Sequence, residues 1–238
     1  MTAVHELGHL DAIALQSPYA LGVNTEMVRY SFTVFSRFLR GSSILELGPA
    51  EGVMTEALAT VGVDLTLVEG AAHFCESLAA RFPAADVVHA LFEDYIPHRR
   101  FDNIVIGHVL EHVEDPVALL AAARGWLAPG GRILAAVPNA RSIHRQAAVL
   151  MDLLPREDAL NETDHLCGHR RVFTPESFRH AFREAGLELM HFGGYWLKPL
   201  SNRQIDATFT PEMIRAFMML GERYPDIAAE IYAVAGAE

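Results

Sequence analysis

The chain has 238 residues, 51% of them hydrophobic, and its 30 acidic against 19 basic side chains give a formal net charge of −11. This length and apolar content are enough to bury a sizeable core, so a single α/β domain is expected. The acidic balance argues against tight binding to nucleic acid or to an anionic membrane, because both carry negative charge. A solvated acidic surface is the expected consequence.

The cysteine content and the hydropathy of the chain indicate the cellular compartment in which the protein is expected. Cys75 and Cys167 are the two cysteines, and their contexts do not suggest a disulfide framework, which fits a reducing compartment. Spanning a bilayer takes roughly 20 consecutive apolar residues, and no run in the chain approaches that length. The N-terminus has acidic and histidine residues where a signal peptide would begin with basic ones. We therefore expect a cytoplasmic protein with no membrane partner and no targeting segment.

The first predicted element is a helix that Thr25 caps at its N-terminus and that stops at Gly41. Its apolar face consists of Val28, Phe32, Phe35 and Leu39. In chain order, the pattern then predicts strand 42–48, helix 51–61, strand 64–69, helix 71–82, strand 86–91, strand 101–107, helix 115–127 and strand 131–137. Such alternation indicates a parallel sheet with helices on both faces.

Three helix starts are marked by an N-capping residue followed by proline, at Asp115-Pro116, Thr174-Pro175 and Thr210-Pro211. Gly130 is expected to close the helix that begins at the first of them. The apolar stretches Leu187–Leu197 and Ile227–Ala235 come after the second and third starts. They predict two late strands with a helix inserted between them.

An apolar run leads into a glycine-containing turn at residues 44–54, which read Ile-Leu-Glu-Leu-Gly-Pro-Ala-Glu-Gly-Val-Met. Gly48 allows a sharp turn, and Gly52 lets a ligand lie close to the helix start, where N–H groups point outward. A second apolar run ends at Glu69, where an acidic ribose-binding residue is expected. The pattern predicts a nucleotide-type loop, although Ala50 stands where dinucleotide-binding enzymes have a second glycine.

Three later segments accompany this loop: 101–106 (Phe-Asp-Asn-Ile-Val-Ile), 109–116 (Val-Leu-Glu-His-Val-Glu-Asp-Pro) and 127–134 (Leu-Ala-Pro-Gly-Gly-Arg-Ile-Leu). In this order and spacing the chain resembles the class I S-adenosylmethionine-dependent methyltransferases, from about Thr25 to Ala235. It is most similar to the small-molecule branch that carries the Leu-Glu-His-Val segment.

The resemblance implies an α/β fold with a Rossmann-like, seven-stranded, mostly parallel sheet, helices on both faces and an antiparallel last strand. It implies a single methyltransferase domain over 1–238. Within that domain, residues 1–41 would form a helical cap, 42–138 the cofactor-binding core, and 139–175 and 198–226 the insertions on the substrate side.

The resemblance also implies a site for S-adenosyl-L-methionine at the carboxyl ends of the strands. Glu69 would accept both ribose hydroxyls, Glu46 would hold the glycine loop or the amino acid part of the cofactor, and Glu93 or Asp94 would accept from the adenine. The full set of implied cofactor-binding residues is Glu46, Gly48, Ala50, Gly52, Glu69, Gly70, Phe92, Glu93, Gly107 and His108.

Methyl transfer needs alignment, exclusion of water and, where the nucleophile is protonated, a base, for which histidine is suited near neutral pH. His108 is the first candidate because it follows the fourth strand, where in the family the methyl donor faces the acceptor. His169 and then His165 come next, since the segment 164–171 is expected to line the acceptor pocket. His112 is expected to hold a neighbouring backbone group.

Two histidine-containing segments resemble metal-binding motifs, but neither is expected to bind a metal. His5-Glu6-Leu7-Gly8-His9 matches the H-E-x-x-H pattern of zinc proteases, but the downstream sequence indicates a different enzyme. In the group His165, Cys167 and His169, the spacing points the side chains alternately in an extended chain, and no fourth ligand is evident. We predict no metal and interpret this group as a pocket wall.

The sequence thus predicts an enzyme that transfers a methyl group from S-adenosylmethionine to a small metabolite, with oxygen or nitrogen as the favoured acceptor atom and carbon next. Two alternatives stay open: a non-catalytic protein that binds S-adenosylmethionine or S-adenosylhomocysteine, and a nicotinamide-dependent Rossmann oxidoreductase. The expected partner is a small-molecule acceptor, with a homodimer as a candidate assembly and no nucleic acid or membrane.

Overall fold

The computed structural model describes residues 20–61 and 64–237. Its helices and strands are, in chain order, α2 (Gly22–Phe35), β1 (Ser43–Leu47), α3 (Val53–Ala59), β2 (Asp64–Glu69), α4 (Ala72–Arg81), β3 (Asp86–His89), β4 (Phe101–Gly107), α5 (Pro116–Trp126), β5 (Leu127–Pro138), α6 (Ile143–Leu150), α7 (Glu162–Leu166), α8 (Pro175–Glu184), β6 (Glu188–Tyr195), α9 (Asn202–Thr208), α10 (Pro211–Arg223), the 3₁₀ turn η1 (Pro225–Ile227) and β7 (Glu230–Gly236).

The strands form one seven-stranded sheet in the order β3-β2-β1-β4-β5-β7-β6. Strands β1 to β5 are parallel to one another, whereas β7 runs antiparallel to both β5 and β6. The predicted α/β class, the mostly parallel sheet and the antiparallel last strand are therefore confirmed. Because parallel strands end at the same edge, the loops that follow β1, β2 and β4 lie near one another, as ligand-binding loops do in folds of this kind.

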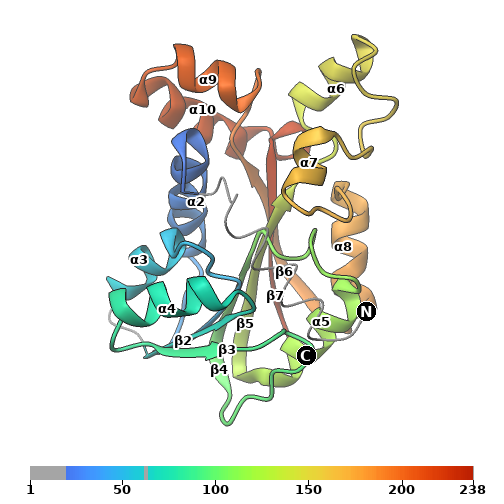
Figure 1. The fold of residues 1–238 in the computed structure, drawn as a ribbon. Helices are drawn as coiled ribbons and strands as arrows, with labels where there is room; N and C mark the ends of the chain where they lie inside the picture. The colour runs from blue at the N-terminus through green and yellow to red at the C-terminus, as the bar shows by residue number, and fades with distance from the viewer. Residues whose placement is uncertain (1–19, 62–63, 238) are drawn as a thin grey trace.

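Helices cover both faces of the sheet, with α2, α3 and α4 on one side and α5 and α8 on the other (Figure 1). Successive side chains of a strand point to opposite faces. Accordingly, Leu45 and Leu47 of β1 pack with the α5 and α8 layer, while Ile44 packs with the α2, α3 and α4 layer. The long apolar runs of the sequence thus become strands that are buried on both faces.

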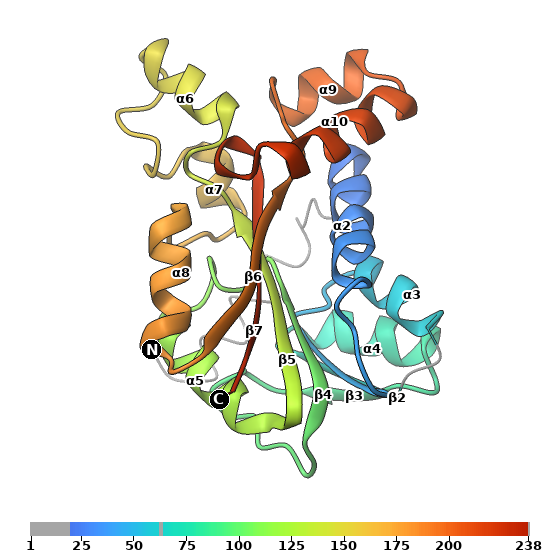
Figure 2. The same cartoon turned by 180° about the vertical axis from the view of Figure 1, so that it is seen from behind.

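Four helices gather around the carboxyl ends of the parallel strands. Helices α6 and α7 lie on one side of this edge, and α9 and α10 lie on the other, in both views of the molecule (Figures 1 and 2). The sequence pattern predicts α10 but not α6, α7 or α9, because each of these three helices has eight residues or fewer and gives too short a pattern. No helix in the described part of the chain is long and apolar enough to cross a membrane.

The first helix differs from its prediction. It begins at Gly22, so Thr25 lies inside the helix and is not its N-cap. The amide of Val23 in the first turn donates to the Asp206 carboxylate of α9 at 2.8 Å, and this tertiary contact replaces a local cap. The helix ends at Phe35, before Gly41. Its buried face is Val23, Met27, Ser31, Val34 and Phe35, which shares one residue with the predicted face.

The end of α5 also corrects a prediction. The helix stops at Trp126, and Leu127 already pairs with Phe101 of β4. Gly130 therefore does not close the helix but lies in the irregular start of β5, with a φ of 76°. The register shifts between Phe101 and Asn103 at this point. The three N-caps predicted before a proline are confirmed, since Asp115, Thr174 and Thr210 each accept a backbone N–H in the first turn of their helices.

Gly221 fixes how closely α10 approaches the end of β6. In this region, the amide of Trp196 donates to Met218 O at 3.0 Å and the amide of Leu197 to Phe217 O at 2.8 Å. A Cβ at position 221 would fall on the backbone of Tyr195 and Trp196, which cannot rotate aside. We expect Gly221→Ala to lower the free energy of unfolding, measured in urea, by about 1–3 kcal/mol, the usual cost of overpacking.

The matched control is Gly125→Ala in α5, where an added Cβ meets nothing within 4 Å. Alanine there should raise the free energy of unfolding by roughly 0.5–1 kcal/mol, because glycine is the poorer helix former. Equal stability of Gly221→Ala and the wild type would show that α10 is able to withdraw from the sheet without loss.

Candidate active site

The glycine loop between β1 and α3 has the backbone geometry that its residues suggest. Gly48 has a φ of 65° and Gly52 a φ of 76°, both in the left-handed region where glycine is favoured. A Cβ at Gly48 would lie 2.8 Å from Cγ2 of Val109, so the loop presses against the turn that follows β4. The place of a Cβ at Gly52 is occupied by Leu78 and Phe82. Close packing on α4 therefore also requires this glycine.

Glu69 connects two loops at the carboxyl end of β2. Its carboxylate accepts from the Ala50 amide at 3.0 Å and from the Ala71 amide at 2.9 Å, and the residue is 8% exposed. Burial raises the pKa of Glu69, against the effect of these backbone amides. A carboxylate has about four acceptor positions, and the two amides occupy two of them. Glu69 can therefore still accept from two neighbouring hydroxyls, as the ribose of S-adenosylmethionine requires.

Glu46 lies one strand away and is 3% exposed. Its Oε2 accepts from Thr55 Oγ1 at 2.7 Å, which ties β1 to α3 under the glycine loop. Burial raises the pKa of Glu46 to about 8; the Thr55 hydroxyl opposes this shift and the nearby Glu69 adds to it. The buried carboxyl group is thus protonated over much of the neutral range, and its role next to the loop is that of a hydrogen-bonded neutral acid.

The raised pKa of Glu46 makes the stability of the ligand-free protein depend on pH. The folded state keeps this proton up to pH about 8, whereas an unfolded glutamate loses it near its ordinary value of 4.5. The favourable contribution is complete below pH 4.5 and is lost as the pH rises to about 8. Because glutamine cannot ionise and still accepts from Thr55, we expect Glu46→Gln to gain stability over the wild type as the pH rises through this window. Urea unfolding at several pH values tests this, and a constant difference between the two proteins would contradict it.

The remaining predicted cofactor residues lie around the same edge. The place of a Cβ at Gly48 is 3.4 Å from Cζ of Phe92, so this ring borders the glycine loop. Glu93 is exposed and Gly70 is buried. At Gly107 a Cβ would meet only Met54 Cε at 4.0 Å, so the end of β4 is not closely packed on that side. The structure thus brings these residues together; their contacts with the cofactor stay predictions.

His108 follows β4 and stands at the centre of a buried polar group. Its backbone has a φ of 56°, which is unusual for a residue other than glycine and occurs at functional turns. Its Nδ1 is 3.5 Å from Glu111 Oε1 and 3.8 Å from Glu230 Oε2, and its Nε2 is 3.4 Å from Tyr195 Oη. Burial lowers the pKa of His108, but Glu111 and Glu230 outweigh it, so that the net shift is upward.

The partners of His108 come from three separate segments of the chain. Glu111 lies in the turn after β4, Glu230 begins β7 and Tyr195 ends β6. The Tyr195 hydroxyl is also 2.5 Å from Ser31 Oγ of α2. The sequence analysis did not identify Glu230, Tyr195 or Ser31. A signal existed for Glu230, since a carboxylate inside an apolar run is rarely buried without a purpose.

The other two candidate bases lie apart from each other. His169 is packed into the site, with its ring edge-on to His112 at a centroid distance of 4.8 Å. Its Nδ1 is 3.0 Å from Oδ1 of Asp164, which lies in the first turn of α7. His165, in α7, is exposed. His5 and His9, with the zinc-protease pattern, lie outside the described residues.

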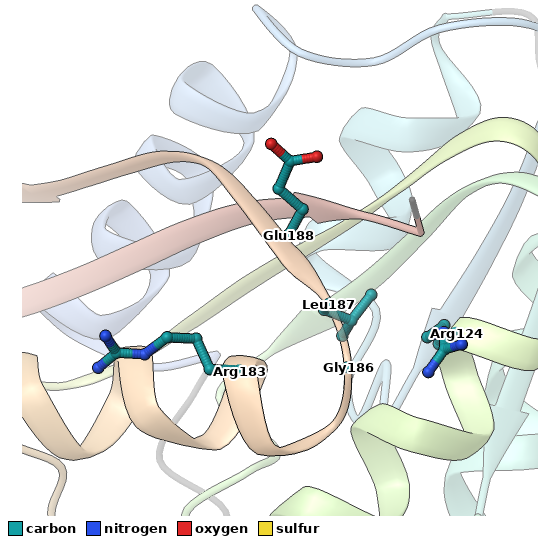
Figure 3. Close-up of a pocket in the computed structure, with 5 residues that line it drawn as sticks. All are labelled: Arg124, Arg183, Gly186, Leu187 and Glu188. Atoms are coloured by element: carbon teal, nitrogen blue, oxygen red, sulfur yellow. The ribbon is translucent and has the colours of Figure 1, made fainter.

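A shallow pocket at the start of β6 is not part of this site. Arg124, Arg183, Gly186, Leu187 and Glu188 line it (Figure 3). Glu188 pairs with Gly236, which pairs with Arg132 in the first half of β5, so the pocket lies toward the edge opposite the strand carboxyl ends. Its charged side chains point in different directions and do not converge on one point (Figure 3).

A family model described as a methyltransferase domain matches residues 25–191. The chain belongs to this family and is an S-adenosylmethionine-dependent methyltransferase. The predicted class and cofactor are thereby confirmed. The structural features fit this cofactor, since Glu69 keeps acceptor positions for a diol beside a glycine loop that approaches the end of β4.

Curated relatives and solved structures agree with this assignment. The chain is 26% identical over 188 residues to the ubiquinone biosynthesis O-methyltransferase of Xanthomonas euvesicatoria, covering 74% of this chain and 75% of that protein. It is 29% identical over 178 residues to the ubiquinone biosynthesis O-methyltransferase of Thiobacillus denitrificans, covering 68% of this chain and 72% of that protein. The structure of the CcbJ methyltransferase from Streptomyces caelestis has the same fold, with a TM-score of 0.61 at 18% identity over 89% of this chain and 95% of that one.

Proposed function

We propose that this methyltransferase acts on a hydroxyl oxygen of a small-molecule acceptor and that His108 is its general base. The observation that carries this proposal is the buried histidine between two carboxylates at the end of β4. A hydroxyl group must lose its proton during methylation, whereas a neutral amine or a carboxylate can react by alignment alone. A dedicated base therefore favours oxygen over nitrogen.

The orientation of the imidazole supports its role. Nδ1 faces Glu111 at 3.5 Å and Glu230 at 3.8 Å, and the negative charge of the carboxylates favours the ring proton on this nitrogen. Nε2, on the side of Tyr195, is then the acceptor nitrogen of the neutral ring. An orienting carboxylate behind a base is the usual arrangement for a histidine that takes a proton from a nucleophile. Here Glu111 is the positioning residue and His108 is the residue that meets the acceptor.

The cofactor supplies an activated methyl group on a sulfonium centre when it is bound. Glu69 would hold the ribose hydroxyls, the amides of the glycine loop and the buried Glu46 would hold the amino acid end, and Phe92 would flank the adenine. Bound in this way, the methyl donor would lie at the end of β4 next to His108, where the acceptor can be aligned with it.

The net charge of the chain and the names of its curated relatives both support a small-molecule acceptor. A net charge of −11 opposes a polyanionic substrate such as nucleic acid. The curated relatives are named as O-methyltransferases of ubiquinone biosynthesis, which is methylation of a small molecule. His169 in the segment before α8 borders the same space and is the second candidate to contact the acceptor. His165, exposed on α7, is the third.

A paired acceptor panel tests this function. Each phenol or aliphatic alcohol is offered beside its amine analogue, and methylated product and S-adenosylhomocysteine are measured by mass spectrometry. We expect transfer to hydroxyl groups and little or none to the amines. Methylation confined to nitrogen would overturn the proposal, and S-adenosylhomocysteine binding without turnover on any acceptor would favour the non-catalytic binding protein.

A further inference from the structure

We propose that Glu111, His112 and His169 form a binding site for one divalent transition-metal ion beside the acceptor position. One ligand atom from each of these residues lies within 4.8 Å of the other two. At metal–ligand distances of about 2.0–2.2 Å, neighbouring ligand atoms around a tetrahedral ion are about 3.5 Å apart, so the three atoms would have to draw together by roughly 1 Å when the ion binds. This site was not expected from the sequence, which separates His169 from the other two.

Glu111 is the strongest indication that something is to be bound here. The residue is fully buried, and neither carboxylate oxygen has a hydrogen-bond partner within the described structure. His108 approaches Oε1 only to 3.5 Å. A buried carboxylate without hydrogen bonds carries a large desolvation cost, and such groups are normally paired or bound to metal. A cation between Glu111 and the two imidazoles would satisfy it.

His169 is oriented as a metal ligand would be. Its Nδ1 is held by Asp164 Oδ1 at 3.0 Å, while its Nε2 is buried and has no hydrogen-bond partner among the described residues. Asp164 in turn accepts from Arg145 at 3.1 Å and from the Asn161 amide at 2.9 Å. A carboxylate that fixes the far nitrogen of a histidine is the usual outer shell of a metal site, because it sets the tautomer and the ring orientation.

The backbone around the three residues is tied together independently of any ion. The amide of Arg170 donates to Glu111 O at 2.8 Å, and the guanidinium of Arg171 donates to Leu110 O at 3.0 Å and Glu114 O at 2.8 Å. These bonds hold the segment that carries His169 against the turn that carries Glu111 and His112. The site is therefore preformed on two segments that are distant in the sequence.

Two imidazoles and one carboxylate suit ions such as Zn²⁺ or Mn²⁺ and not Ca²⁺ or Mg²⁺, which prefer oxygen ligands. Three protein ligands leave at least one position open, as in metal sites that act on a bound oxygen. In the O-methylation proposed above, this open position would take the acceptor oxygen and lower its pKa close to His108. That role rests on the proposed function, whereas the metal site itself does not.

The test measures metal content and affinity in the full-length protein. The protein is treated with a chelator and dialysed, Zn²⁺ or Mn²⁺ is added, and binding is followed by calorimetry and elemental analysis. We expect one ion per chain, an affinity at least tenfold lower in Glu111→Gln and His169→Ala, and an unchanged affinity in His165→Ala, the exposed neighbour. Asp164→Asn should weaken binding by about 10–100-fold, as is typical for an outer-shell carboxylate.

Two further measurements keep the result unambiguous. The ion must remain in the double variant His5→Ala and His9→Ala, which removes the other zinc-like pattern of this chain. Stabilisation by S-adenosylhomocysteine in every variant shows that the variants are folded. Absence of a stoichiometric ion in the wild type, wild-type affinity in Glu111→Gln and His169→Ala, or loss of the ion with His5 and His9 would overturn the metal site. Failure of O-methylation on the acceptor panel would overturn the proposed function and leave the metal result standing.

Discussion

Replacing His108 with asparagine should lower kcat by about 10²–10⁴-fold, the usual contribution of a general base, while the affinity for S-adenosylhomocysteine stays nearly unchanged. Asparagine is the informative replacement because His108 has a φ of 56°, a conformation that asparagine adopts more readily than most residues. The backbone turn should survive, and only the titratable ring is lost. Single-turnover rates with the identified acceptor, compared with calorimetric cofactor binding, provide the measurement.

The same experiment with His169→Ala and His165→Ala ranks the three candidates. His165→Ala should retain nearly full activity because the side chain is exposed on α7. His169→Ala should lose activity together with the bound ion, whereas His108→Asn should lose activity and keep the ion. Wild-type turnover in His108→Asn would show that catalysis depends on alignment and exclusion of water and that the ring is a pocket wall.

Replacing Glu69 with alanine should weaken S-adenosylhomocysteine binding by an amount on the order of 1.5–3 kcal/mol, or about 10–150-fold in Kd, as expected for hydrogen bonds to a charged group. Two effects add in this variant. The ribose would lose its proposed acceptor, and the amides of Ala50 and Ala71 lose the carboxylate that joins their loops. Isothermal titration calorimetry measures the change directly.

Glu76→Ala is the matched control, because Glu76 is an exposed glutamate on the neighbouring helix α4. It removes the same charge near the site without touching the loop, so its affinity should equal that of the wild type. Wild-type affinity in Glu69→Ala would show that the ribose is held elsewhere and that Glu69 serves only to pin the loop.

Local chemistry accounts for the parts of the fold that the sequence predicts well. Strands 64–69 and 101–107 are observed at their predicted bounds, and their short apolar runs are typical of parallel strands that are buried on both faces. The proline-containing helix starts at Thr174 and Thr210 depend on a cap and a fixed φ within a few residues. Gly48 likewise has the positive φ that its turn requires.

Contacts between distant segments decided the rest. The Asp206 carboxylate of α9 accepts a backbone N–H in the first turn of α2. The residues of α2 alone therefore do not indicate where the helix begins. Gly130 has the sequence context of a helix end. It lies in β5 instead, because Leu127 already pairs with Phe101 of β4.

The active site shows the same division most clearly. The sequence by itself determined the class of enzyme, the cofactor and the place of His108 after the fourth strand, because each depends on order and spacing along the chain. Only the tertiary structure placed Glu230 and Tyr195 around His108, and His169 beside Glu111. Those residues meet because the antiparallel β7 and the segment before α8 return to the carboxyl edge of the sheet, and no local pattern records that meeting.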